Sequence, residues 1–323
     1  MLDTFKSAAA EVAEAFAGTN YEHAWTPPIS QIEKWWDSAT LQAIARAMAC
    51  INDLAPRTDM RVIDLLKLAF CRTIIELANV SFGHQSMSFK RHEPAPMLAV
   101  ISSAEQEGIN AWFRAVADIE AAATQPLISE PRFLYCDARD LTAALADNTY
   151  SCVITSPPYP NRMSYIRELR PYMYWLGYLN NGREAGELDW QAIGGTWGCA
   201  TSNVGRWKPD NEIAIPVDWF SAVLDSIAET SPLLSNYVRK YFYDMSLHCE
   251  SLFRVLRGSG VINYIVGNSK FYDVLLPVES LFAAMFEKCG FVDVNVSTIR
   301  KRTSKKELFE FVVAARKPHA EFK

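Results

Sequence analysis

The residues best suited to chemistry are four consecutive ones, Ser156, Pro157, Pro158 and Tyr159. The two prolines have no amide donor and a fixed φ, so the backbone is rigid and its carbonyl oxygens are left as hydrogen-bond acceptors. Ser156 adds a hydroxyl acceptor, and Tyr159 adds a face on which a flat ring can stack. Together these groups suit a reaction on the amine of a planar ring, such as a nucleobase taken out of its helix. The plainer alternative is a strand that ends in a Pro-Pro turn with a tyrosine packed behind it.

The flanking sequence predicts the elements that position these four residues. Residues 150–155 predict a strand that ends at the motif, and residues 133–135 predict a shorter strand upstream. Asp137 lies in the loop after the shorter strand. An acidic residue after one strand and the motif after the next are the arrangement by which a doubly wound sheet places a ligand at its carboxyl edge. The sequence therefore predicts an α/β fold.

Residues 155–159, Thr-Ser-Pro-Pro-Tyr, resemble the catalytic motif of the DNA amino-methyltransferases, which use S-adenosylmethionine and carry a Ser/Asp/Asn-Pro-Pro-aromatic sequence. The serine form is more typical of enzymes that modify the N4 amine of cytosine than of those that modify the N6 amine of adenine. The likeness spans residues 130–317 and continues in residues 160–165 with the helix through Leu176, in residues 260–269, and in Gly290 and Phe291 with strands at 292–299 and 308–315.

The resemblance implies methyl transfer from S-adenosylmethionine to cytosine N4 in DNA, without a metal ion. It implies that Ser156, Pro157, Pro158 and Tyr159 are catalytic, and that the cofactor lies near Asp137, Ala138 and Thr155. Adenine N6 in DNA, or a base in RNA, stays an alternative target, because the same acceptors serve any planar amine. A catalytically inactive subunit that binds DNA or regulates a partner is a second alternative.

Three segments could contact DNA. The net charge of −5 gives no overall attraction for phosphates, so contacts must come from local patches. A solvated hairpin tip explains the segment that begins at Arg300 equally well, folding onto a partner explains residues 206–208 equally well, and core packing explains most of the aromatic residues after the motif. The candidates are Arg162 and Tyr165 after the motif, Arg206, Trp207 and Lys208 in an irregular region, and Arg300, Lys301 and Arg302 at the turn between the last two strands.

A Gly-rich turn after a strand, which lets the methionine part of the cofactor approach the backbone, is not evident in the sequence. Residues 16–20 follow helical sequence, so Gly18 is expected to cap a helix, and residues 194–198 are expected to form a flexible loop on the substrate side. We therefore expect a partial Rossmann-like sheet, completed by a second subunit that carries the Gly-rich cofactor motif. An inactive subunit, or one chain with a diverged cofactor loop, would also explain the pattern.

Before the catalytic region, the sequence predicts helices at residues 3–17, 30–52, 58–80 and 104–124, joined in part by a polar linker at 81–92. Trp35 and Trp36 are expected to pack inside this region. The expected organisation is a helical region at residues 1–130 and a methyltransferase domain at 131–323, with an inserted recognition segment at about 180–240 and a further helix from about 217.

Composition agrees with a cytoplasmic protein. The 323 residues are 50% hydrophobic, enough for a sizeable core, and no apolar run predicts a membrane span or a signal peptide. The seven cysteines are scattered and form no Cys-x-x-Cys pair. Reduced core thiols are expected, with neither disulfides nor a zinc site.

Overall fold

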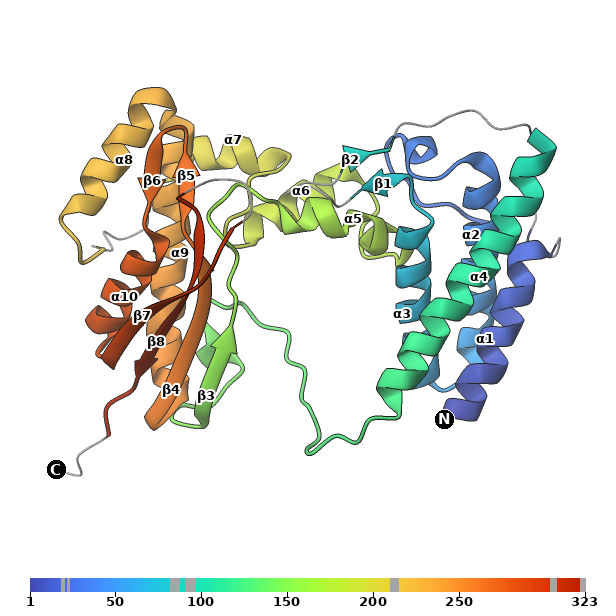
Figure 1. Ribbon diagram of the computed structural model, residues 1–323, viewed down its shortest axis with the longest axis horizontal. Coiled ribbons are helices and arrows are strands. Elements are labelled where there is room, and N and C mark those ends of the chain that lie inside the picture. Colours follow the sequence, from blue (N-terminus) through green and yellow to red (C-terminus); the bar gives the residue numbers. More distant parts are fainter. Residues whose placement is uncertain are drawn as a thin grey trace. The chain divides into compact units, whose positions relative to one another are not determined.

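The computed structural model describes residues 1–18, 21, 24–81, 88–90, 97–209, 215–302 and 307–319, with side chains from Ala104 onward in the helix that begins at Met97. Most of the predicted polar linker and the tip of the predicted basic turn, residues 303–306, lie outside the described residues. The chain divides into two compact units (Figure 1). One comprises residues 1–130 and 166–185, and the other comprises residues 131–165 and 186–323.

The first unit is helical. Its long helices are α1 (Leu2–Ala17), α2 (Ser38–Leu54), α3 (Met60–Glu76) and α4 (Met97–Ala123), and they pack on one another. Its shorter elements are η1 (Ile32–Lys34), η2 (Ala55–Arg57), the pair β1 (Val80–Ser81) and β2 (Ser88–Phe89), and most of α5 (Tyr165–Trp175).

The predicted single helix at residues 30–52 is wrong at its start. Asp37 accepts hydrogen bonds from the amides of Ala39 and Thr40, both at 3.0 Å, and this N-cap begins α2 at Ser38. Trp35 and Trp36 precede the helix and are each 1% exposed, which confirms that they pack in the core.

The second unit is built on a four-stranded mixed sheet, as expected for an α/β fold. The strand order is β3 (Tyr150–Thr155), β4 (Leu256–Gly267), β8 (Phe309–Arg316) and β7 (Val292–Lys301). β3 is parallel to β4, and the other pairs are antiparallel. α9 (Pro232–Val255) and α10 (Val278–Cys289) pack against the sheet (Figure 1). The remaining elements are η3 (Leu141–Ala143), α6 (Gly182–Gln191), α7 (Cys199–Arg206), α8 (Trp219–Thr230), and the hairpin of β5 (Ser269–Phe271) and β6 (Val274–Leu276).

The two faces of the sheet differ in burial. On β4, Ile262 and Tyr264 are 0% exposed, whereas Val261 on the opposite face is 38% exposed. Ile154, which is paired with Asn263, shares that open face and is 74% exposed. Among the described residues no strand pairs with the outer edge of β3. The strand that leads into the candidate site therefore has an unpaired edge and an exposed apolar side chain.

The predicted strand at residues 133–135 is wrong. The segment is irregular and forms no strand, and Phe133 and Tyr135 are 93% and 102% exposed. Strands need neighbouring backbone with which to exchange hydrogen bonds, and the described chain offers this segment none. The segment before residue 217 also differs from expectation, because it contains α6 and α7.

Candidate active site

The end of β3 leads directly into the proline-rich loop. Pro157 and Pro160 are buried, Pro158 and Tyr159 are half-buried, and Ser156 is exposed. The Ser156 side chain lies close enough to the Tyr159 phenol to lower its pKa. The pKa of the Tyr159 phenol is nonetheless raised, chiefly by burial, so the ring stays neutral at physiological pH. An exposed hydroxyl therefore stands beside a neutral aromatic ring.

The two proline carbonyls differ in their hydrogen bonding. The Pro158 carbonyl accepts a hydrogen bond of 2.6 Å from the Tyr241 phenol. Within the described part of the chain, the Pro157 carbonyl accepts none. Of the two acceptors, the Pro157 oxygen is the one left for a substrate amine.

The Tyr159 ring meets a predicted DNA-contacting residue. The guanidinium carbon of Arg302 lies 5.5 Å from the ring centroid, and its Nη1 donates to the Asn268 carbonyl at 3.1 Å. A Cβ at Gly267 would lie 2.8 Å from Tyr159 Cε2 and 2.9 Å from Arg302 Nη1. The absence of a side chain at Gly267 is what allows ring and guanidinium to approach the end of β4.

Sequence reasoning missed the role of Asn268. This residue is 4% exposed. Its side-chain Nδ2 donates to the Glu307 carbonyl at 2.9 Å, and its Oδ1 accepts from the Phe309 backbone amide at 2.9 Å. These bonds fix the base of the turn that carries Arg302. The available signal was a polar residue directly after a buried apolar strand.

The backbone after the motif is bound to α9 and to itself. The Arg162 amide donates to the Tyr237 phenol at 3.3 Å, and Arg162 has a left-handed φ of 65°. The Asn161 side chain accepts from the Met163 amide at 3.0 Å. Tyr237 and Tyr241 were not among the predicted site residues.

A buried carboxylate fixes the next segment. Asp189 is 1% exposed and accepts from the Ser164 hydroxyl at 2.5 Å and from the Trp197 amide at 2.6 Å. A Cβ at Gly195 would lie 1.6 Å from the Asp189 carbonyl oxygen, so only glycine fits there. Residues 194–198, expected to form a flexible loop, are thus packed on Asp189.

The other predicted DNA contacts have different surroundings. Arg162 and Tyr165 are exposed directly after the loop, and Arg206, Lys208 and Lys301 are exposed as well. Trp207 packs edge-on against Tyr243, with ring centroids 5.3 Å apart, and Arg300 forms an ion pair of 2.5 Å with Glu310. The structure brings Arg302 to the proline-rich loop and gives Trp207 and Arg300 partners within the chain.

The predicted cofactor segment is tied to α9. The Asp137 carboxylate is held by Arg139, with Nη2 to Oδ2 at 2.7 Å, and this hydrogen bond lowers the pKa of Asp137. Arg139 also reaches Asp244 at 3.4 Å, and the Ala138 carbonyl accepts from His248 Nδ1 at 2.6 Å. Thr155 ends β3 opposite Tyr264. Among the described residues, none of the glycines with positive φ follows a strand, so a counterpart of the expected Gly-rich cofactor turn is not found there.

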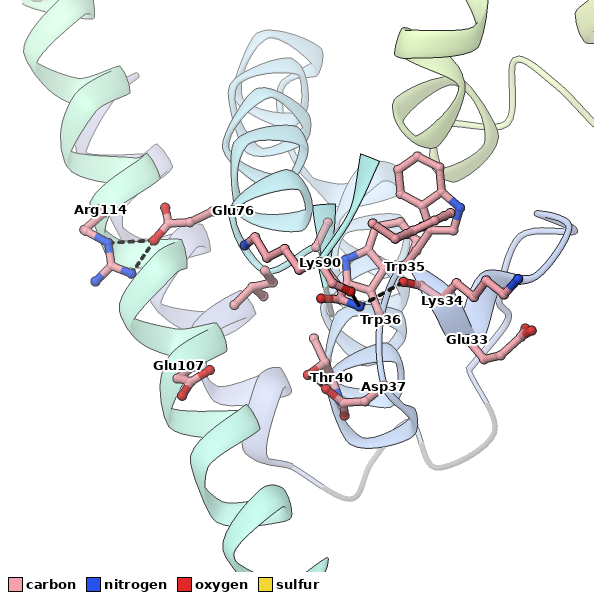
Figure 2. A pocket seen from close by; sticks show the side chains of 14 residues that line it. Glu33, Lys34, Trp35, Trp36, Asp37, Thr40, Glu76, Lys90, Glu107 and Arg114 are labelled. Atoms are coloured by element: carbon pink, nitrogen blue, oxygen red, sulfur yellow. Dashed lines mark hydrogen bonds and ion pairs between the residues drawn. The ribbon is translucent and has the colours of Figure 1, made fainter. Parts of the chain in front are cut away.

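The helical unit has a pocket of about 690 Å³ whose walls include Trp35, Lys90 and Glu107 (Figure 2). Two of its acidic groups already have partners. Glu76 pairs with Arg114 at 3.0 Å, and Asp37 accepts from the Thr40 hydroxyl at 2.8 Å. This pocket therefore offers a weaker arrangement for chemistry than the proline-rich loop.

Among the described residues, no group of three or more His, Cys, Asp or Glu side chains could hold a metal ion. The described helices likewise include none that is long and apolar enough to cross a membrane.

Comparison with known proteins gives partial matches. No protein-family model matches the chain. Over 180 residues the chain is 24% identical to the type II methyltransferase M.BsoBI of Geobacillus stearothermophilus, covering 48% of this chain and 34% of that protein. The chain thus spans about a third of the relative's length.

Solved structures of TTHA0409 from Thermus thermophilus, provisionally named a DNA modification methylase, match 58% of this chain and 53% of theirs at 16% identity. One of these structures is complexed with S-adenosyl-L-methionine. The TM-scores are 0.30 and 0.31, too low to show a common fold.

Proposed function

We propose that this chain carries the catalytic loop of an S-adenosylmethionine-dependent methyltransferase that acts on the N4 amine of cytosine in DNA. The observation that carries the proposal is the pair of acceptors beside Tyr159, namely the hydroxyl of the exposed Ser156 and the Pro157 carbonyl, which accepts no hydrogen bond from the described residues. The partial sequence similarity to a type II methyltransferase supports the same reaction class.

The loop would act by positioning and by stabilising charge. A cytosine flipped out of the duplex stacks on Tyr159, and its N4 amine donates to Ser156 Oγ and the Pro157 carbonyl. These acceptors stabilise the positive charge that grows on nitrogen as the N–CH₃ bond forms and the S–CH₃ bond breaks. The amine proton would then pass to the Ser156 hydroxyl as that exposed hydroxyl gives its own proton to water. The bound cofactor would supply the methyl group, and alignment of the reactants supplies much of the rate.

We propose further that a second subunit completes the sheet. The outer edge of β3, which no strand of the described residues pairs, and the exposed Phe133, Tyr135 and Ile154 support this, because such surfaces normally pair or are covered. The lack of a Gly-rich turn after any strand in the described residues supports it as well. The partner would supply strands and the Gly-rich loop. The seven free cysteines suit the reducing cytoplasm, where we place the complex.

The test is calorimetry with S-adenosylmethionine, first with this chain alone and then with the product of the neighbouring open reading frame. We expect binding only in the mixture, followed by methyl transfer to DNA and N4-methylcytosine in the digested nucleosides. Binding by the chain alone would remove the need for a partner. N6-methyladenine as the product would overturn the choice of base.

One observation favours a second candidate function. Since the described residues include no Gly-rich turn after a strand, the chain could be an inactive subunit that binds DNA or regulates a partner. That alternative predicts DNA binding by the mixture without methyl transfer. It also predicts that Ser156→Ala has no effect on any activity of the complex.

A further inference from the structure

The proline-rich loop has few amide donors with which to hold its own shape. Pro157, Pro158 and Pro160 all lack an amide hydrogen, and within the loop Asn161 donates to the Tyr159 carbonyl at 2.7 Å. The rigid prolines restrict φ but do not fix the direction of the loop as a whole. Other parts of the fold must therefore hold the acceptors in place.

Helix α9 supplies those contacts through two buried phenols one turn apart. Tyr241 is 1% exposed and donates to the Pro158 carbonyl at 2.6 Å, while Tyr237 is 2% exposed and accepts from the Arg162 amide at 3.3 Å. Burial raises the pKa of both phenols, so each keeps its proton. The Tyr241 hydroxyl therefore stays neutral and remains a hydrogen-bond donor to the loop.

The same helix also holds the predicted cofactor segment. Asp244 contacts Arg139 at 3.4 Å, and His248 contacts the Ala138 carbonyl at 2.6 Å. Positions 237, 241, 244 and 248 follow the spacing that places side chains on one face of a helix. One face of α9 therefore contacts both the loop after β3 and the segment before it.

We propose that Tyr241 is a positioning residue for methyl transfer. By binding the Pro158 carbonyl, it turns that oxygen away from the substrate and holds the Pro157 carbonyl and the Ser156 hydroxyl toward the amine. Tyr237 has the supporting role of fixing the turn at Arg162. This inference rests on the proposed function, and it assigns α9 the task of aligning the acceptors with the cofactor segment.

Tyr241→Phe removes only the hydroxyl and is the test variant in the assembled complex. We expect kcat to fall about 10- to 100-fold, because small displacements of aligned groups are costly. KM for DNA and cofactor should change less than about twofold, since the contact acts through the loop. The double variant Ser156→Ala/Tyr241→Phe should lose less than the product of the two single losses, because both act on one arrangement.

Tyr264→Phe is the matched stability control. It removes an equally buried phenol hydroxyl that bonds His248 at 2.5 Å and not the loop. An unchanged kcat for Tyr241→Phe would overturn the proposal. The proposal would also be overturned if Tyr241→Phe and Tyr264→Phe were equally stable and unfolding accounted for the whole loss of kcat in Tyr241→Phe.

A measurement on the chain alone separates this inference from the proposed function. Tyr241→Phe should speed hydrogen exchange at the Asn161 and Arg162 amides, whereas Tyr264→Phe should not. Unchanged exchange would sink the positioning role even if the complex is active. Faster exchange in the Tyr241→Phe chain, together with a complex in which neither wild type nor Ser156→Ala methylates DNA, would confine the failure to the proposed function.

Discussion

The guanidinium carbon of Arg302 lies 5.5 Å from the centroid of the Tyr159 ring. A residue from the turn after β7 thus covers part of the aromatic surface at the end of β3. A base that stacks on Tyr159 must use the other face of the ring or displace the guanidinium. Under the proposed function, Arg302 would contact a DNA phosphate or base edge in either case.

Arg302→Ala should weaken DNA binding by the assembled complex and reduce the slope of log Kd against log salt by about 1, the loss of one counterion-releasing contact. Filter binding over a salt series measures this. Arg254→Ala is the control, because Arg254 is 61% exposed and its ion pair is with Asp147 at 3.6 Å. A slope unchanged by Arg302→Ala would mean that Arg302 only supports the ring.

Gly267→Ala should displace Tyr159 and Arg302, because its Cβ would lie within 3 Å of both side chains. We expect the free energy of unfolding to fall by about 1–3 kcal/mol, as for other overpacked cores, and turnover to drop. Gly182→Ala is the matched control, because nothing lies within 4 Å of its Cβ. Urea denaturation of both variants checks this, and equal stabilities would contradict the packing argument.

Ser156→Ala and Tyr159→Ala should each lower turnover strongly while the protein stays folded. The first removes an acceptor for the amine, and the second removes the ring on which the base stacks. Single-turnover methylation and a thermal melt of each variant measure the two quantities. Near-normal rates in both variants would refute the assigned roles.

The sequence was sufficient for elements whose own residues determine them. The apolar run at 150–155 and the strands at 292–301 and 309–316 formed close to where they were expected, as did the helix ending at Ala17. The proline-rich loop followed from residue type alone, since missing amides and fixed φ do not depend on distant contacts.

Other features depend on contacts between distant segments. Tyr241 and Tyr237 lie at helical spacing in an apolar helix, a pattern that core packing explains equally well. The Arg302–Tyr159 contact needs Gly267 at the end of β4 to bring two segments together. The strand expected at 133–135 needs a neighbour that the described chain does not offer.

Phe133→Ser tests the proposed partner surface. The side chain is 93% exposed, so the thermal stability of the chain alone should not change. If a second subunit covers this segment, losing a buried aromatic contact should weaken association by about 2 kcal/mol or more. Calorimetric titration with the partner measures it, with Met60→Ser, 64% exposed in the helical unit, as the control. Equal affinities for the wild type and the Phe133 variant would exclude this surface.

His248 should make stability depend on pH. Burial lowers its pKa in the folded chain, where Nδ1 donates to the Ala138 carbonyl and Nε2 accepts from the Tyr264 phenol. The unfolded chain takes up the proton first, near its ordinary pKa of about 6.5. The neutral ring therefore contributes its full stability above that pH, and the contribution is lost as the pH falls toward the folded pKa. One proton gives a loss of at most about 1.4 kcal/mol per pH unit.

Urea denaturation from about pH 8 to pH 5.5 measures this dependence. We expect His248→Gln to be less stable than wild type at the upper pH, because it disturbs two hydrogen bonds, and to lose less further stability on acidification. Near the lower pH the two proteins should converge. Parallel pH profiles for wild type and variant would show that another group carries the acid sensitivity and that His248 is not held neutral by its burial on α9.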